Sequence, residues 1–249
     1  MRARPSEVVL TSGGTESDNL AVIGTYRARR RADDRRRRVL VSSIEHHAVL
    51  DATEALAAHE GAEAVLLPVD RTGRLDVAAL EAEIARDPAS VALVSVMWAN
   101  NEVGTLQPVD DVVRLAHAHG VPVHTDAVQA VGQVPVDFAA SGVDLLTVTA
   151  HKLGGPVGVG ALVAVRGAEL EPLVHGGGQE RGVRSGTLDA ASARAFAVAA
   201  EPGRRVAARP RRPGARAARP AAGRRPGGGA RGGAWWARRS TPRCGCPAT

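Results

Sequence analysis

Short apolar runs alternate along the chain with longer segments in which apolar positions recur every three or four residues. The short runs are rich in β-branched residues and predict strands at 7–11, 38–43, 62–69, 91–97, 121–126, 143–149 and 160–165. The longer segments predict helices at 16–31, 48–60, 77–85 and 109–119, with a short one at 127–131. This alternation predicts an α/β fold with a mostly parallel sheet flanked by helices.

Polar residues whose side chains can bind ligands or take part in catalysis follow five of the predicted strands. The segments that follow them are SGGTES, IEHH, WANNE, HTDAVQ and AHK. In open parallel sheets, ligands bind beyond the carboxyl ends of the strands. The pattern therefore predicts a functional site at that edge.

One of these segments contains Lys152, the single lysine of a chain that has 31 arginines. A desolvated lysine amine loses its proton and attacks carbonyls to form a Schiff base, which arginine cannot do. The alternative is a stray surface lysine in a GC-rich gene that encodes its basic residues as arginine. The neighbouring residues have to decide between the two.

A Schiff-base lysine points to pyridoxal 5'-phosphate, which also needs an acid at its ring nitrogen and a phosphate cradle. Asp126, 26 residues before Lys152, is a candidate for the acid, although it also fits as the N-cap of 127–131. Residues 12–15, Ser-Gly-Gly-Thr, are a candidate cradle at a helix start. The alternative is a plain turn with Thr15 as cap. The segment matches neither a P-loop nor GxGxxG.

The histidines do not predict a metal site. His46 and His47 are adjacent, and His117, His119 and His124 are close in sequence, but neighbours at i+1 or i+2 do not share a helix face and no cysteine is near. At the end of the second strand, the His46 imidazole is instead suited to stack on an aromatic cofactor.

Charge divides the chain into two parts. The net charge is +6, yet residues 201–249 hold 13 Arg and one acid, which leaves 1–200 at −6. Of these 49 residues, 40 are Arg, Ala, Gly or Pro, so they cannot bury enough apolar surface to fold. We expect a disordered tail and consider three explanations: nucleic-acid binding, a linker, or an out-of-frame product of a GC-rich gene. The WW and CGC segments favour the third.

The composition argues against a membrane-spanning, secreted or disulfide-rich protein. No apolar run reaches the length of a membrane span, and the start lacks the apolar stretch of a signal peptide. The two cysteines, Cys244 and Cys246, give no disulfide framework. These features predict a cytoplasmic protein without a membrane partner.

Six segments, in order, resemble motifs of the cysteine desulfurases, in the class V aminotransferase group of pyridoxal-phosphate enzymes. They are TSGGTESDNLAV, EHHAVLD, WANNEVGTLQPV, HTDAVQAVGQVPVD, TAHKLGGPVGVGAL and HGGGQERGVRSGT, and they cover roughly residues 6–200. The resemblance implies the fold of the aminotransferase-like large domain. It extends to selenocysteine lyases, which remain an alternative.

The resemblance implies a role for each matching residue. Lys152 would form the Schiff base and move protons at the substrate α-carbon, and His46 would stack on the ring and assist proton transfer. Asp126 would pair with the ring nitrogen and Gln129 with the ring oxygen. The implied cofactor-binding residues are completed by Gly14, Thr15, Thr149 and His151 at the phosphate, Asn101 near the substrate carboxylate, and Thr187 at the phosphate of a partner subunit.

The implied reaction converts L-cysteine to L-alanine and passes sulfur, through an enzyme cysteine persulfide, to acceptor or iron–sulfur scaffold proteins. The implied active form is a homodimer. The sequence departs from the family at 149–152, where T-A-H-K replaces the common S-G-H-K.

The family's N-terminal segment and its small domain with the persulfide cysteine are not recognisable. We therefore expect an incomplete large domain at 1–200 followed by the tail at 201–249, with impaired desulfurase activity. Cys244 and Cys246 are not assigned as catalytic. The alternative of another class is an inert body that binds nucleic acid through the tail, and we consider it less favoured because six motifs lie in the body.

Overall fold

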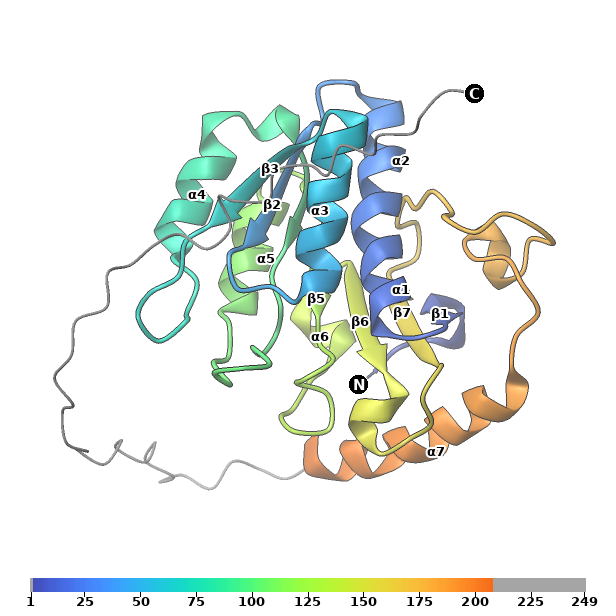
Figure 1. The fold of residues 1–249 in the computed structure, drawn as a ribbon. Coiled ribbons are helices and arrows are strands. Elements are labelled where there is room, and N and C mark those ends of the chain that lie inside the picture. Colours follow the sequence, from blue (N-terminus) through green and yellow to red (C-terminus); the bar gives the residue numbers. More distant parts are fainter. Residues whose placement is uncertain (1, 208–249) are drawn as a thin grey trace, which may run out of the picture. The chain divides into compact units, whose positions relative to one another are not determined.

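Seven strands form one sheet in the computed structural model, which describes residues 2–207 and the side chains as far as Glu201. The strands are β1 (Val8–Thr11), β2 (Arg38–Ser42), β3 (Glu63–Leu67), β4 (Val91–Ser95), β5 (Val123–Asp126), β6 (Leu145–Thr149) and β7 (Gly160–Ala164). Their order is β1-β7-β6-β5-β4-β2-β3 (Figure 1). Only β7 runs antiparallel to its neighbours, so the other six strands end at the same edge.

Helices connect the strands across the sheet (Figure 1). They are α1 (Gly14–Asn19), α2 (Thr25–Ala32), α3 (His47–Glu60), α4 (Val77–Arg86), α5 (Val109–His117), α6 (Phe138–Ser141) and α7 (Ala190–Ala207). A π-helical turn, Leu20–Gly24, joins α1 to α2. All seven predicted strands and the four longer predicted helices are confirmed to within a few residues.

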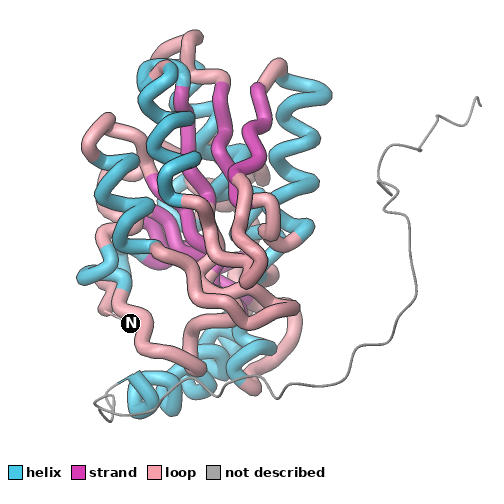
Figure 2. Tube along the Cα trace, turned by 90° about the vertical axis from the view of Figure 1, so that its left-hand side faces the viewer, coloured by secondary structure: helices cyan, strands magenta, loops and turns pink. Residues whose placement is uncertain are grey.

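Alternate residues of the strands face two helical layers. Leu40 of β2 belongs to the core that includes Leu80 of α4 and Val112 of α5. Its neighbours Val39 and Val41 belong to the core beneath α2 and α3. Figure 2 shows the strands lying between helices on both sides. Burial of both faces explains why the strands read as nearly continuous apolar runs.

The short helix predicted at 127–131 is wrong. These residues form turns, in which the Val131 N–H donates to the Ala127 carbonyl at 3.0 Å. Gly132 follows with a φ of +85°, which ends the helical path after a single turn.

Helix α7 runs past the predicted boundary at residue 200 and ends at Ala207. It lies against the 3₁₀ turn Ala150–Leu153. Most of the predicted tail, including Cys244 and Cys246, falls outside the described residues, so its expected disorder stays a prediction. Within the part of the chain that the structure describes, no helix has both the length and the apolarity needed to cross a membrane.

Arg38, the first residue of β2, has a buried guanidinium group. The Arg38 side chain is 3% exposed, and it donates to the Glu83 backbone carbonyl at 2.8 Å. It also pairs with the Glu83 carboxylate and lies 3.5 Å from that of Glu63. This buried charge is therefore compensated on two sides.

We expect Arg38→Met to lower the free energy of unfolding by about 2 kcal/mol, less than for a fully buried pair because both glutamates stay partly in water. Urea unfolding at neutral pH measures the change. The matched control is Arg35→Met, which removes an exposed pair with Asp33 and is expected to have little effect. Equal effects of the two substitutions would contradict the prediction.

Candidate active site

A cavity of about 300 Å³ opens at the carboxyl edge of the sheet. It brings together nine of the ten residues predicted to bind the cofactor: Gly14, Thr15, His46, Asn101, Asp126, Gln129, Thr149, His151 and Lys152. These residues come from the ends of five strands, as expected for a parallel sheet. Three further lining residues, Asp18, Met97 and Val128, were not predicted from the sequence.

Asp126 is the last residue of β5 and is 5% exposed. Its Oδ1 accepts a hydrogen bond from the Val128 N–H at 2.8 Å, so the cap-like contact forms and the same carboxylate also faces the cavity. Burial raises the pKa of Asp126, while His46 and Lys152 act in the opposite direction. A cation bound here would stabilise the ionised carboxylate.

One end of the cavity gathers hydroxyl and imidazole groups at the start of α1. Thr149 Oγ1 and His151 Nδ1 lie 3.0 Å apart, which fixes the two side chains relative to each other. Thr15 lies within α1 and does not cap it, because the N-cap position is Gly13. The alternative of a plain turn capped by Thr15 is therefore wrong.

Glycine allows β7 to approach this turn closely. A Cβ on Gly160 would lie 2.7 Å from the Gly13 Cα and 2.9 Å from the Val148 carbonyl oxygen. The antiparallel strand thus packs directly beneath the Ser12–Thr15 segment, and any side chain at 160 would displace it.

The His46 ring is oriented by a hydrogen bond at the start of α3. Its Nδ1 accepts from the Ala48 N–H at 3.1 Å. The neutral ring therefore carries its proton on Nε2, which leaves a donor for the cavity. Next to it, His47 contacts Asp51 at 3.1 Å on the exposed surface and takes no part in the cavity.

Two adjacent asparagines have different roles. Asn100 is 8% exposed, and its Oδ1 accepts from the Glu102 and Val103 N–H groups at 2.9 Å each. These bonds build the turn that presents Asn101, which is exposed and lines the cavity. Asn100 is thus a structural residue of the WANNE segment.

Lys152 lies in the 3₁₀ turn after β6, and its side chain lines the cavity. The residue is exposed, so the desolvation expected of a reactive lysine is not present in this structure. The tight turn holds it at the mouth of the cavity, where a bound molecule is needed to exclude water from the amine.

Buried ionisable groups form the floor beneath Asp126. Asp18 is 2% exposed and its Oδ1 has no hydrogen-bond partner among the described residues. Burial, together with the charges of Asp126 and Glu45, raises the pKa of Asp18 well above its ordinary value. Asp18 lies four residues after Gly14, so helical spacing was the signal that could have found it.

Glu45 and His124 are also fully buried near this floor. Burial raises the pKa of Glu45 to about 8, against the opposing effect of a 2.7 Å hydrogen bond from the Met97 N–H. Burial lowers the pKa of His124 to about 3, and its ring lies between Ser95 and Thr147 at 2.8 and 3.1 Å. At neutral pH, Glu45 is therefore predominantly protonated and His124 uncharged.

Thr187 is the one predicted residue outside the cavity. It is exposed and lines a separate depression with Leu10 and Gly158. Among the described residues, no three His, Cys, Asp or Glu side chains are grouped so that they could hold a metal ion.

The fold and the cavity together define an aminotransferase-like α/β domain with a lysine and a buried aspartate at one site. Residues 1–201 match the family model of aminotransferase class V, and the chain belongs to this family.

Its relatives include cysteine desulfurases. The chain is 55% identical over 199 residues to the IscS-like cysteine desulfurase of Mycobacterium tuberculosis, covering 80% of this chain and 50% of the relative. It is 47% identical over 196 residues to the cysteine desulfurase NifS of Azotobacter vinelandii, covering 79% and 47%. The chain thus spans about half the length of the curated relatives it matches.

Solved structures share this arrangement. DndA from Streptomyces lividans superposes with a TM-score of 0.74 at 37% identity, covering 83% of this chain and 57% of DndA. SspA in complex with cysteine gives 0.72 at 37% identity, covering 80% and 56%.

The buried Glu45 predicts a pH-dependent stability. Because its folded pKa lies above the ordinary value of 4.5, its contribution is fully present below that value and is lost as the pH rises toward about 8. We expect the free energy of unfolding of Glu45→Gln, relative to the unsubstituted chain, to increase between pH 5 and pH 8. The slope is on the order of 1 kcal/mol per pH unit.

Urea unfolding at several pH values in this window measures the difference. Exposed Glu54 on α3 provides the control, because Glu54→Gln makes the same chemical change at a carboxyl group that is not buried. A pH-independent difference for Glu45→Gln would contradict the protonated state.

Proposed function

We propose that this chain is the cofactor-binding large domain of a cysteine desulfurase that uses pyridoxal 5'-phosphate. The observation that carries the proposal is the single cavity lined by both Lys152 and Asp126, with hydroxyl and imidazole groups at one end. The relatives named cysteine desulfurase support L-cysteine as the substrate.

The residues present fit this cofactor. Asp126 is a buried carboxylate in need of a positive partner, which a protonated ring nitrogen provides. Next to the cavity end with Thr149 and His151, Gly14 has no side chain. A Cβ there would come within 3.2 Å of Val128 Cγ2, so glycine keeps that end open. The group of donors at this end suits a phosphate.

The positions of the residues that line the cavity support a binding role for each of them. Gly14, Thr15, Thr149 and His151 hold the phosphate, and Asp126 keeps the ring nitrogen charged. Gln129, half-buried in the cavity wall, donates its amide to the ring oxygen. Asn101, at the rim, orients the substrate carboxylate.

When bound, pyridoxal 5'-phosphate supplies an electron sink for an amino acid's α-carbon. Lys152 Nζ would hold the cofactor and would carry protons to and from that carbon. His46 would lie against the ring and offer its Nε2 proton, because its Nδ1 accepts from the Ala48 N–H. Neutral His124 beneath the floor adds no competing positive charge.

The finer parts of the proposal follow from the family. The sulfur passes to an enzyme cysteine and then to acceptor or iron–sulfur scaffold proteins. Neither Cys244 nor Cys246 is assigned as the persulfide-forming cysteine, and both lie outside residues 2–207. We further propose a cytoplasmic homodimer. The exposed position of Thr187 away from its own cavity supports a role for that residue at the cofactor of a second copy.

The decisive test uses the single lysine. Lys152 and the N-terminal amine are the two primary amines of the chain. We expect borohydride reduction after incubation with pyridoxal 5'-phosphate to attach one cofactor per chain, located by peptide mass spectrometry at Lys152. Lys152→Arg keeps the charge and is expected to abolish this stoichiometric attachment.

Equilibrium dialysis provides a readout that does not depend on the covalent bond. Lys152→Arg should still retain the cofactor measurably through its phosphate contacts, whereas the double variant Thr149→Val, His151→Phe should retain much less. Stoichiometric reduction of the cofactor onto Lys152→Arg would overturn the proposal.

A further inference from the structure

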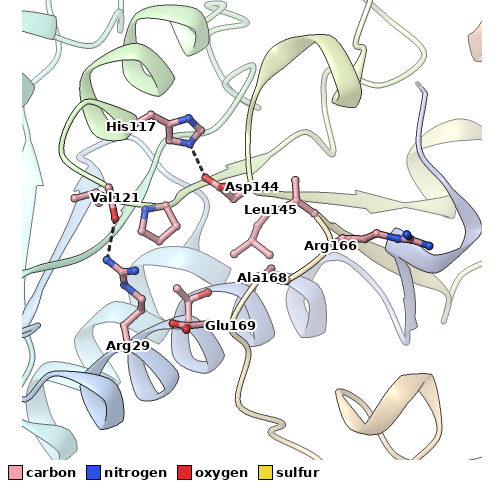
Figure 3. A pocket seen from close by; sticks show the side chains of 13 residues that line it. Arg29, His117, Val121, Asp144, Leu145, Arg166, Ala168 and Glu169 are labelled. Carbon is pink, nitrogen blue, oxygen red and sulfur yellow. Dashed lines mark hydrogen bonds and ion pairs between the residues drawn. The ribbon is translucent and has the colours of Figure 1, made fainter.

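A second cavity lies at the other edge of the sheet, where β5 and β6 begin. Its volume is about 580 Å³, and Figure 3 shows the side chains that line it. Walls come from α2, from the end of α5 and from the segment after β7. None of its residues lines the candidate active site.

Arg29 supplies the main positive charge. Its Nη2 donates to the Gly120 carbonyl at 3.0 Å, while its Nε has no hydrogen-bond partner among the described residues. Its helical neighbours Arg27 and Arg31 have carboxylate partners at 2.6 and 3.3 Å, but within the described part Arg29 has no ion pair. Burial and the nearby Arg36 lower the pKa of Arg29, while the charges of Glu169, Asp144 and Asp33 act in the opposite direction. These carboxylates lie beyond ion-pair distance, so a half-buried guanidinium lacks a direct partner, and an anion in contact with it would supply one.

Thr25 is a second donor without an acceptor. It lies one helical turn before Arg29 on the same face of α2 and also lines the cavity. The residue is 2% exposed, and its hydroxyl has no partner in the described residues. An unpaired buried hydroxyl is unfavourable. A helical threonine has two accessible χ1 rotamers, so rotation can turn this hydroxyl toward the cavity.

The other polar groups of the cavity are hydrogen-bonded or exposed to water. Arg166, the second arginine of the lining, is exposed, and its Nε donates to Ser6 Oγ at 3.3 Å. Asp144 accepts from His117 Nε2 at 2.8 Å and from the Val123 N–H at 2.7 Å. Glu169 is exposed beside the Arg29 side chain (Figure 3). The remaining wall is largely apolar, formed by Val121, Pro122, Leu145, Val165 and Ala168.

We propose that this cavity binds a small organic carboxylate, with its charged end at Arg29 and Thr25 and its apolar body against the Leu145 side of the wall. One guanidinium and one hydroxyl match the donor requirement of a carboxylate. A dianionic phosphate is less suited, because Glu169 adds negative charge and the wall is apolar. The proposal does not depend on the function of the first cavity and is tested without cofactor.

Isobutyrate is the probe, titrated into the full-length chain by calorimetry. We expect saturable binding that Thr25→Val weakens about tenfold, the loss of one hydrogen bond to a charged group. Because the hydroxyl is unpaired without ligand, Thr25→Val should not lower the melting temperature. The matched control is Thr53→Val, whose buried hydroxyl donates to the Val49 carbonyl at 2.8 Å. It should lower the melting temperature and leave isobutyrate affinity unchanged.

Charge variants complete the test. Arg29→Gln should weaken isobutyrate binding at least tenfold, whereas Arg31→Gln on the same helix should not. Glu169→Gln should tighten it, because a repelling charge is removed. No saturable binding, or equal affinity for Thr25→Val and the unsubstituted chain, would overturn the proposal. Inorganic phosphate binding as tightly as isobutyrate would overturn the assignment to an organic carboxylate.

Discussion

The position of the Asp126 carboxylate is the constraint on which the first cavity depends. Backbone bonds fix both sides of the residue, since the Trp98 N–H donates to its carbonyl at 2.8 Å and the Ala127 N–H donates to Thr147 at 3.0 Å. Its own Oδ1 is held by the Val128 N–H. Neighbouring parallel strands therefore determine where the negative charge lies, and the rest of the cavity is arranged around it.

Three carboxyl groups share this low-dielectric region, and they cannot all be ionised there. Burial raises the pKa values of Asp18, Glu45 and Asp126, and neighbouring carboxyl groups add to this effect at Asp18 and Glu45, whereas His46 and Lys152 oppose it at Asp126. His124 stays neutral between two hydroxyls. The floor thus contains four ionisable side chains, of which Glu45 is predominantly protonated and His124 is uncharged at neutral pH.

Much of this arrangement follows from sequence pattern. Apolar runs located all seven strands, and the rule that ligands bind beyond strand ends pointed to the edge of the sheet where the cavity lies. The complete set of ten residues came from the family resemblance, and nine of them line this cavity. Asp126 caps no helix, because 127–131 forms turns, although its Oδ1 accepts from the Val128 N–H. Its carboxylate lines the cavity, and its role at a cofactor stays a prediction.

The errors have physical causes. Gly132 stops the helix predicted at 127–131, an effect of one residue's backbone that periodicity does not detect. Asp18 and Glu45 were missed because acids are normally exposed, and their burial arises only from packing between segments distant in sequence. The exposure of Lys152 depends on a tight turn that its sequence alone does not specify.

Three charged side chains, those of Arg38, Asp126 and Arg29, are buried or half-buried in different surroundings. Arg38 is buried but faces two glutamates and a carbonyl, so its charge is compensated within the chain and its role is structural. Asp126 and Arg29 each border a cavity, and neither has an ion-pair partner among the described residues. The opposite charges that act on them, His46 and Lys152 at Asp126 and Glu169 and Asp144 at Arg29, lie farther away. Because an uncompensated buried charge lowers stability, an external counterion is the simplest means of relieving it. The sign of the required partner follows directly: a cationic group at the carboxyl edge of the sheet, and an anion at the opposite edge.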